Sequence, residues 1–276
     1  MQIRHASNPL DVKFFTTERL RDEFLVPEVM VENELTWKYS HYDRFMIGGA
    51  VPAGQPLRLE APEALKATYF LERRELGIIN TGAPGVVRVD GTDYPLGNKD
   101  CLYVGKGSQE VVFQSVDAAN PARFFLSSTP AHHTYPVQQA ALAKAEPTHL
   151  GAATSANERT IYKYIHQNGI QSCQLVMGLT MFKNGSLWNS IPCHTHDRRM
   201  EVYFYFDLPA EARVFHFMGE STESRHLVVA NEEAIISPPW SVHFGVGTAS
   251  YSFIWAMAGE NQVFSDMDVV QTKDLK

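Results

Sequence analysis

Short runs of β-branched and aromatic residues, separated by turn residues, follow one another along most of this chain. In the first half they include LGIINTGAPGVV, CLYVGKG and EVVFQSV. The segment RVDGTDYPLG (88–97) places an Asp-Gly turn between two such runs, which is a strong signal for a β-hairpin. Runs that recur every 8 to 12 residues or so are typical of an antiparallel sandwich or barrel. The sequence therefore predicts an all-β fold.

The second half repeats the pattern, and helical periodicity is scarce. Its strand-like runs are SCQLVMGLTMF, EVYFYFDL, ARVFHFMG, HLVVANEEAIISPP, SVHFGVG and YSFIWAMAG. We expect helices only in TTERLRDEFLV (16–26) and PVQQAALAKA (136–145). Residues 136–158 contain much Ala, Gln, Thr and Ser and few large apolar residues, which predicts a helical connection. We therefore expect two tandem β-sandwich domains, residues 1–150 and 151–276.

Charge and cysteine usage exclude several classes of protein. The formal net charge is −7 and there is no run of Lys or Arg, so no nucleic-acid-binding surface is expected. No stretch approaches the roughly 18 uncharged apolar residues of a membrane span, and the N-terminus lacks the apolar core of a secretory signal. The three cysteines, Cys101, Cys173 and Cys193, are scattered and imply no disulfide framework. A cytoplasmic protein is expected.

Two histidines and a glutamate are close together in PCHTHDRRMEVYFYFD (192–207). On a strand, His194 and His196 point to the same face because side chains alternate. Glu201 follows five residues later, an odd offset that would place it on the opposite face of one straight strand. The intervening DRRM is therefore expected to turn or bulge, so that Glu201 enters a neighbouring strand and faces inward.

The strand that begins at Glu201 is expected to have a polar and an apolar face. The polar face would carry Glu201, Tyr203, Tyr205 and Asp207. The apolar face would carry Val202, Phe204 and Phe206. Cys193 would point away from the site and be buried among apolar residues.

A third histidine, His243, follows a proline-bounded turn in SPPWSVHFGVG. Three imidazoles and one carboxylate suit a borderline divalent ion such as zinc, iron or manganese. An HxH pair alone is weak, since histidine pairs also occur on exposed strands. The added glutamate and distal histidine favour a metal site formed by His194, His196, Glu201 and His243. His132 and His133 are adjacent, would face opposite ways on a strand, and are expected in a loop.

The spacing HxHx4E, followed by PxWxxH, resembles the two cupin motifs, with Trp240 in place of the glycine of the second motif. More specifically, the chain resembles the family of 5-keto-4-deoxyuronate isomerases, also called 4-deoxy-L-threo-5-hexosulose-uronate ketol-isomerases. The stretches that carry the resemblance are SHYDRFMIGGAVP (40–52), CHTHDRRMEVYFYFD (193–207), SPPWSVHFGVGT (237–248) and SFIWAMAGENQVFSDMD (252–268).

The resemblance implies a cytoplasmic, hexameric bicupin with one zinc ion per subunit, iron or manganese being less favoured. It implies that His194, His196, Glu201 and His243 bind the zinc in the second domain, and that the first domain is a degenerate cupin without metal. The implied reaction, in pectin and uronate breakdown, converts 5-dehydro-4-deoxy-D-glucuronate to 3-deoxy-D-glycero-2,5-hexodiulosonate. The implied partners are this small acidic sugar and copies of the chain itself.

An acidic sugar needs a local cation, and Arg198 and Arg199 lie in the turn between His196 and Glu201. Arginine matches a carboxylate with a planar fork. One of the two is expected to face the pocket; both lying exposed is an equally weighted alternative. For proton transfer, Tyr203, Asp207 and a metal-bound hydroxide are all candidates. The sequence does not choose between proton transfer and hydride shift.

Other functions are compatible with the same ligands. They are a 5-deoxyglucuronate isomerase of inositol breakdown, an iron-dependent dioxygenase and a non-catalytic sugar-binding bicupin. Metal content would separate the dioxygenase, and a substrate panel would separate the two isomerases. Fold alone cannot decide, because one fold hosts many activities.

Overall fold

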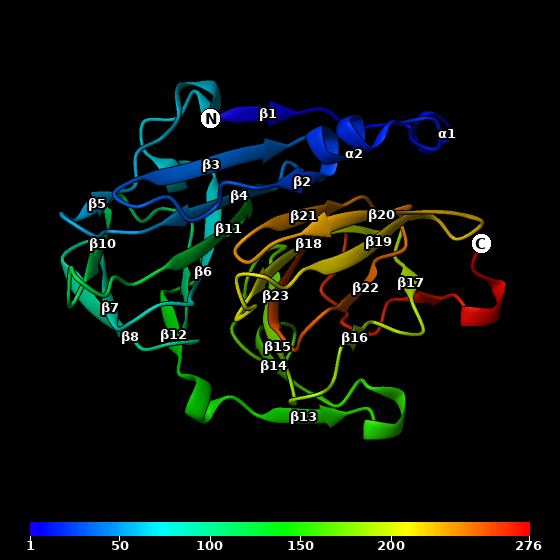
Figure 1. Ribbon diagram of the computed structural model, residues 1–276. Helices are drawn as coiled ribbons and strands as arrows, with labels where there is room; N and C mark the ends of the chain where they lie inside the picture. The colour runs from blue at the N-terminus through cyan, green and yellow to red at the C-terminus, as the bar shows by residue number, and fades with distance from the viewer.

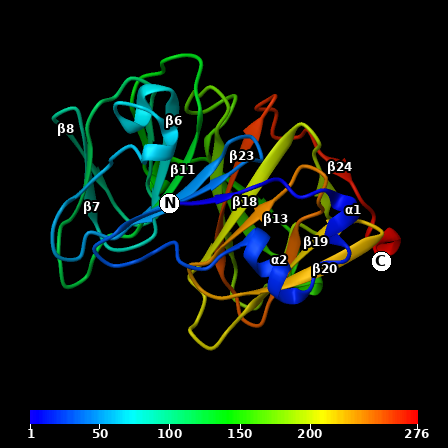
Figure 2. The same cartoon turned by 90° about the horizontal axis from the view of Figure 1, so that it is seen from above.

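Two β-sandwiches lie side by side in the computed structural model, which describes residues 1–276 (Figures 1 and 2). In each, a seven-stranded sheet faces a four-stranded sheet. The large sheet of the first sandwich contains, in spatial order, β1 (Gln2–Arg4), β3 (Leu35–Ser40), β4 (Met46–Ala50), β11 (Phe124–Pro130), β6 (Arg74–Asn80), β9 (Cys101–Val104) and β12 (Gln138–Ala140). Its small sheet contains β5 (Leu57–Arg58), β10 (Val111–Ser115), β7 (Gly85–Val89) and β8 (Thr92–Leu96).

The second sandwich has the same layout. Its large sheet contains β13 (Pro147–Leu150), β14 (Arg159–Ile165), β15 (Val176–Phe182), β23 (Ser252–Gly259), β18 (Arg199–Phe206), β21 (Ala234–Ser237) and β2 (Leu25–Val26). Its small sheet contains β16 (Trp188–Asn189), β22 (Phe244–Gly247), β19 (Val214–Glu220) and β20 (Glu223–Val229). A separate two-stranded ribbon joins β17 (His194–Thr195) to β24 (Asp268–Val269). The predicted all-β fold of two sandwiches is confirmed.

Helices are few and short. The α-helices are α1 (Pro9–Val12) and α2 (Thr17–Phe24), and the 3-10 turns are η1 (Glu63–Leu65), η2 (Phe70–Glu72), η3 (Leu142–Lys144), η4 (Ala153–Ser155) and η5 (Thr272–Asp274). The predicted helix in 16–26 is confirmed as α2, whose N-cap Thr16 accepts a hydrogen bond from the Arg19 backbone N–H. No helix has the length and apolar character that crossing a membrane requires.

The predicted hairpin at Asp90-Gly91 is also confirmed. Strands β7 and β8 pair with Val89 opposite Thr92, and both turn residues have positive φ, +47° and +84°. Two consecutive positive φ values define the turn type that matches the right-handed twist of a hairpin, and Asp-Gly suits them.

Apolar side chains form one core inside each sandwich and a third core between them. The first sandwich buries residues such as Leu76 and Phe113, and the second buries residues such as Val214 and Leu227. The third core joins the outer faces of the two large sheets, where the Phe125 and Phe204 rings stack with centroids 4.5 Å apart. The alternation along β18 therefore turns one face toward the other sandwich and the opposite face toward its own interior.

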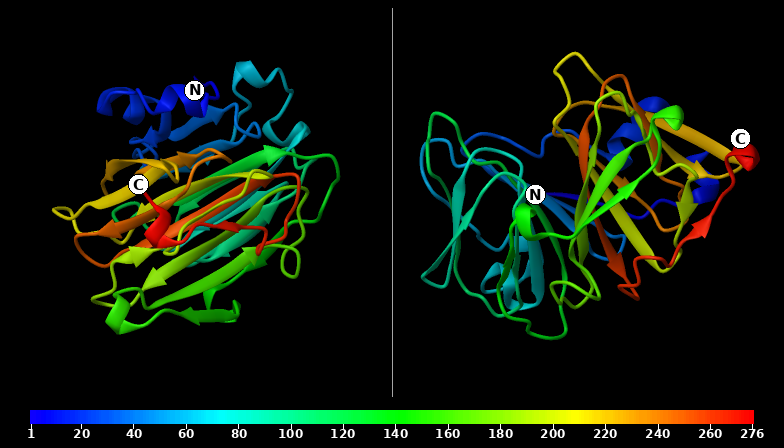
Figure 3. Two further views of the ribbon diagram at one scale, coloured as in Figure 1. Left: turned by 90° about the vertical axis from the view of Figure 1, so that its right-hand side faces the viewer. Right: turned by 90° about the horizontal axis from the view of Figure 1, so that it is seen from below.

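The predicted helical connection at 136–158 is wrong. This segment forms the edge strands β12 and β13, with single turns η3 and η4 (Figure 3, right, in green). β12 pairs with β9 and β13 pairs with β14, so each strand completes the edge of a different sheet. An isolated short helix is only marginally stable, whereas pairing at a sheet edge satisfies the backbone N–H and C=O groups of this segment. Tertiary pairing therefore outweighs the helix propensity of alanine here.

The N-terminal segment reaches across to the second sandwich. Strand β2 pairs with β21, and Leu20 and Phe24 of α2 are buried in the second core. Figure 1 shows both helices, in blue, above the second sandwich. The division at residue 150 stays a prediction.

Candidate metal centre

The predicted turn between His196 and Glu201 is present. His194 lies on β17, and β18 begins at Arg199. The Arg199 backbone N–H donates to the His196 carbonyl at 3.0 Å, which closes the turn. Glu201 is the third residue of β18 and faces inward, as expected, while His243 directly precedes β22 in the opposite sheet.

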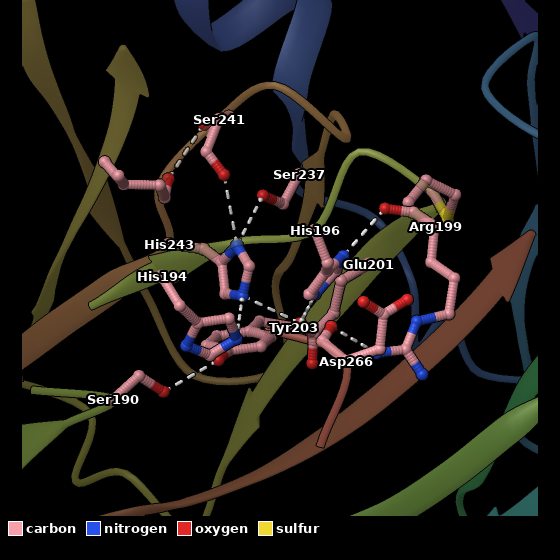
Figure 4. A network of polar contacts seen from close by, with 12 residues as sticks. Ser190, His194, His196, Arg199, Glu201, Tyr203, Ser237, Ser241, His243 and Asp266 are labelled. Atoms are coloured by element: carbon pink, nitrogen blue, oxygen red, sulfur yellow. Dashed lines mark hydrogen bonds and ion pairs between the residues drawn. The ribbon is translucent and has the colours of Figure 1, made fainter. Parts of the chain in front are cut away.

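One ligand atom from each of His194, His196, Glu201 and His243 lies within 4.8 Å of the others (Figure 4). Glu201 Oε2 is 3.0 Å from His196 Nε2 and 2.9 Å from His243 Nε2. His243 Nε2 is in turn 3.0 Å from His194 Nε2. Ligand atoms that each lie about 2.0–2.2 Å from one ion are separated from one another by distances comparable to those between these four side chains. The sequence-predicted ligands therefore converge, and their donor set fits a divalent ion.

Outer contacts orient two of the imidazoles. His196 Nδ1 is 2.8 Å from the Arg199 carbonyl, and His243 Nδ1 is 3.2 Å from the Ser241 carbonyl. The Ser237 hydroxyl also lies 3.2 Å from His243 Nδ1. A carbonyl can only accept, so Nδ1 carries the proton and Nε2 presents its lone pair to the centre.

Electrostatics favour the metal-binding form of Glu201 and His194, whereas the pKa of His196 is raised because burial, which lowers it, is outweighed by the hydrogen bond to Glu201 and the charge of that carboxylate. Burial would raise the pKa of the Glu201 carboxyl, but His243 and His196 hold it well below its usual range. Burial, reinforced by His243, lowers the pKa of His194 to about 3. Both directions favour the forms that bind metals, carboxylate and neutral imidazole.

The cluster opens into a cavity of about 310 Å³, within the size range of small-molecule sites. Its lining includes Arg159, Thr180, Ser190, Tyr203, Phe264 and Met267. The Tyr203 hydroxyl is 2.8 Å from Ser190 Oγ. Burial, with Glu201 nearby, raises the pKa of Tyr203 well above its ordinary value, so the hydroxyl stays protonated. Tyr203 is therefore suited to donate a hydrogen bond into the cavity.

The two arginines of the turn diverge. Arg199 lines the cavity and is fully buried. Its Nη2 donates to the Asp266 carbonyl at 3.0 Å, while Nε and Nη1 are enclosed without a partner. Arg198 is outside the cavity lining and binds the carboxylates of Asp266 (2.6 Å) and Asp268 (2.9 Å). Arg198 thus fastens the segment that contributes Met267 to the cavity wall.

Asp207 is not brought to the cluster. Strand β18 ends at Phe206, and Asp207 has a φ of +55°, which breaks the alternation that would place it with Glu201 and Tyr203. Its carboxylate binds Lys99 at 3.0 Å and Ser252 Oγ at 2.9 Å. The prediction that it shares their face is therefore wrong. Cys193 is buried among apolar residues, as expected.

Sequence reasoning missed Arg159, the first residue of β14. It lines the same cavity and is partly buried, which lowers its pKa. Its Nη1 donates to the Asn157 carbonyl at 2.9 Å, whereas Nε and Nη2 have no protein partner and are not enclosed. No ion pair of the chain includes it.

Replacing Arg198 by alanine should leave the metal in place and lower kcat/KM by less than about tenfold, because partly exposed ion pairs contribute little. Because the segment around Asp266 would be held less firmly without Arg198, we expect the change mainly in KM. Steady-state kinetics with metal analysis would test this. A loss beyond about 10²-fold with metal retained would instead place Arg198 in direct contact with the substrate.

Two comparisons with known proteins identify relatives of this chain. A sequence profile of the KduI/IolB family matches residues 24–272. A protein from Halalkalibacterium halodurans, named 4-deoxy-L-threo-5-hexosulose-uronate ketol-isomerase, is 55% identical over 276 residues, covering 100% of both chains. The chain belongs to the KduI/IolB family. The predicted resemblance is confirmed over the whole length.

Solved structures support the fold of this family member. An IolB-like protein from Salmonella typhimurium superposes with a TM-score of 0.69 at 13% identity, covering 87% of this chain and 94% of that chain. A mutant of Bacillus subtilis oxalate decarboxylase superposes with a TM-score of 0.55 at 9% identity, covering 80% of this chain and 70% of that chain. At such low identity these likenesses concern the fold alone, and they confirm the predicted all-β bicupin class.

Proposed function

We propose that this chain is a ketol-isomerase that uses a divalent metal ion to convert 4-deoxy-L-threo-5-hexosulose uronate to 3-deoxy-D-glycero-2,5-hexodiulosonate. The observation that carries the proposal is the convergence of His194, His196, Glu201 and His243 at the base of a cavity that also contains an unpaired arginine. The relative named for this activity, identical at 55% of positions, supports the same substrate.

Zinc is the metal that we propose. Three imidazoles and one carboxylate are nitrogen and oxygen donors typical of zinc sites, and iron or manganese is the alternative. A divalent ion held there supplies Lewis-acid polarisation to a carbonyl and its neighbouring hydroxyl, the groups that exchange oxidation level in aldose–ketose isomerisation. The residues around the cluster then orient the sugar and exclude water.

Tyr203 is proposed to assist from the wall of the cavity. Its protonated hydroxyl, supported by Ser190, can donate to a sugar oxygen on which negative charge develops. Phe264 and Met267 line the same space and limit the water that reaches it. Asp207 is not included, because Lys99 and Ser252 bind its carboxylate.

The carboxylate of the substrate is proposed to bind Arg159. A uronate's carboxylate must be paired when it leaves water, and two cations line the cavity. The free nitrogens of Arg199 are enclosed by protein, whereas Nε and Nη2 of Arg159 are open and form one edge of the guanidinium fork. Arg159 therefore offers the bidentate geometry that a carboxylate requires.

A substrate panel tests the proposal. The protein would be incubated in turn with the deoxyhexosulose uronate, with 5-deoxyglucuronate and with a catechol as a dioxygenase substrate. We expect turnover of the first alone, with no uptake of oxygen. Preferential turnover of 5-deoxyglucuronate would reassign the chain to the inositol branch. No turnover with bound sugar would favour a sugar-binding protein.

We also propose a homohexamer, because two sandwiches per chain leave sheet edges and faces to be covered. Multi-angle light scattering at micromolar concentration should give a mass near six times that of the 31.0 kDa chain. A stable monomer would contradict this assembly.

A further inference from the structure

In each sandwich, the first residue of one particular strand of the large sheet is an arginine that lies beside a cavity. In the order of the large sheets, β6 occupies the place that β18 occupies in the second sandwich, and β11 corresponds to β23. Arg74 is the first residue of β6 and pairs with Pro130, the last residue of β11. Arg199 is the first residue of β18 and pairs with Gly259, the last residue of β23. Arg74 is therefore the counterpart of Arg199.

A cavity of about 320 Å³ lies beside Arg74. Elements β1, β3 and β6 and the end of β11 contribute to it, and their counterparts β13, β14, β18 and β23 contribute to the metal-site cavity. Its polar lining consists of Arg73, Arg74, Tyr39 and His41, and Ile3 and Phe70 form part of an apolar wall. A single histidine and no carboxylate line it, so a ligand there would bind without a metal.

Arg74 is a buried cation without a counter-ion. Its Nε donates to Ser128 Oγ at 3.0 Å, and its Nη2 donates to the carbonyls of Ser128 and Arg44, both at 2.8 Å. Its Nη1 has no protein partner and is not enclosed. Burial lowers the pKa of Arg74 to about 10, which still leaves it charged at neutral pH.

The neighbouring acid, Glu75, makes no ion pair with Arg74, although its charge favours the protonated guanidinium. Glu75 is fully buried, and its carboxylate accepts hydrogen bonds from the Tyr103 and Thr129 hydroxyls. It also accepts from the backbone N–H groups of residues 173, 174 and 175. Arg73 adds a second guanidinium to the cavity; its side chain is 57% exposed, its Nε lies 4.0 Å from a Glu72 carboxylate oxygen, and its Nη2 donates to backbone carbonyls.

We propose that this first-sandwich cavity binds a small organic carboxylate of the uronate class, held by Arg74 Nη1 and Arg73, without catalysing its conversion. A buried unpaired guanidinium favours an anion strongly, and the apolar wall suits the face of a sugar ring. The choice of a uronate as the anion rests on the proposed function, whereas the anion site itself does not.

The test uses methyl α-D-galactopyranosiduronate, a uronate that cannot open to an aldehyde, as the probe in equilibrium dialysis with the metal-loaded protein. We expect two molecules bound per wild-type chain and one in Arg74→Met. Ala64→Trp, at an exposed position on the rim of the cavity, should likewise bind one and covers the case in which Arg74→Met does not fold. Arg159→Ala should also bind one, at the first-sandwich site.

Both first-sandwich variants should keep kcat/KM within about twofold, because neither residue touches the metal cavity. Unchanged stoichiometry in Arg74→Met and Ala64→Trp would overturn the proposal. A drop in oligomer mass in these variants without loss of bound probe would overturn it too, and would assign the cavity to a contact between copies. Two bound molecules in a chain that turns over no uronate would retain the site and reject only the proposed reaction.

Discussion

Replacing His194 and His196 together by alanine should abolish metal binding and lower kcat/KM by at least about 10³-fold. Single substitutions are a weaker test, because sets of three ligands, His₃ or His₂Glu, hold zinc in other enzymes. The double variant leaves only Glu201 and His243. Changes to groups that merely orient ligands cost about 10- to 100-fold, so removal of two ligands should cost more. Elemental analysis and steady-state kinetics on the same sample would measure both effects.

The matched control is His132→Ala with His133→Ala. This pair makes the same change in composition, and both side chains are exposed outside the cluster. It should keep a full equivalent of metal and near-normal kinetics. Retention of metal and of more than about a tenth of the activity in the His194/His196 variant would show that the ligands have been assigned wrongly.

Replacing Arg159 by alanine should retain the metal but lower kcat/KM by about 10²-fold or more. Two charge-assisted hydrogen bonds contribute about 3 kcal/mol, and each factor of ten corresponds to about 1.4 kcal/mol. Lysine should restore activity only in part, because it presents a point charge without the fork.

The methyl ester of the substrate separates carboxylate binding from other effects of the Arg159 substitution. On the ester, wild type and Arg159→Ala should have similar kcat/KM, since the ester lacks the charge that Arg159 pairs. An equal loss on acid and ester would mean that Arg159 shapes the cavity rather than binding the carboxylate. The same comparison for Arg199→Ala tells whether the enclosed guanidinium contributes.

The four residues of the candidate metal cluster could be predicted because their geometry is largely local. His194 lies on a two-residue strand and His196 directly follows it, and only four residues separate His196 from Glu201. His243 comes from another strand, but a proline-bounded turn marks it in the sequence. The resemblance to the two cupin motifs connected His243 with the other three residues.

Arg159 could not be predicted, because its contact with the site depends on sheet order. It starts β14, which reaches β18 only through β15 and β23. Nothing in ERTIYKYI marks its single arginine as different from other arginines in the chain. The prediction for Asp207 was wrong for a local reason. It extended the strand alternation one residue beyond the end of β18, where a positive φ turns the side chain away.

Amino-acid composition alone did not predict the structure of the segment 136–158 that connects the two sandwiches. Residues 136–145 have the alanine content of a helix, but β12 lies within them and β13 follows, and each strand completes the edge of a sheet. The crossing of β2 into the second sandwich is equally invisible in sequence, because a two-residue strand carries no periodicity. Both features depend on tertiary pairing that becomes defined only when the sheets are assembled.

We propose that the His₃Glu cluster supports metal-dependent isomerisation of a deoxyhexosulose uronate. Proton NMR would follow this compound with metal-stripped protein and with the same protein after one equivalent of zinc is restored. We expect the aldehyde-derived signal to disappear and the signals of the 2-ketose product to grow only after zinc is added. Equal conversion by stripped and restored protein would contradict a role of the metal, and conversion by neither would contradict the isomerase activity.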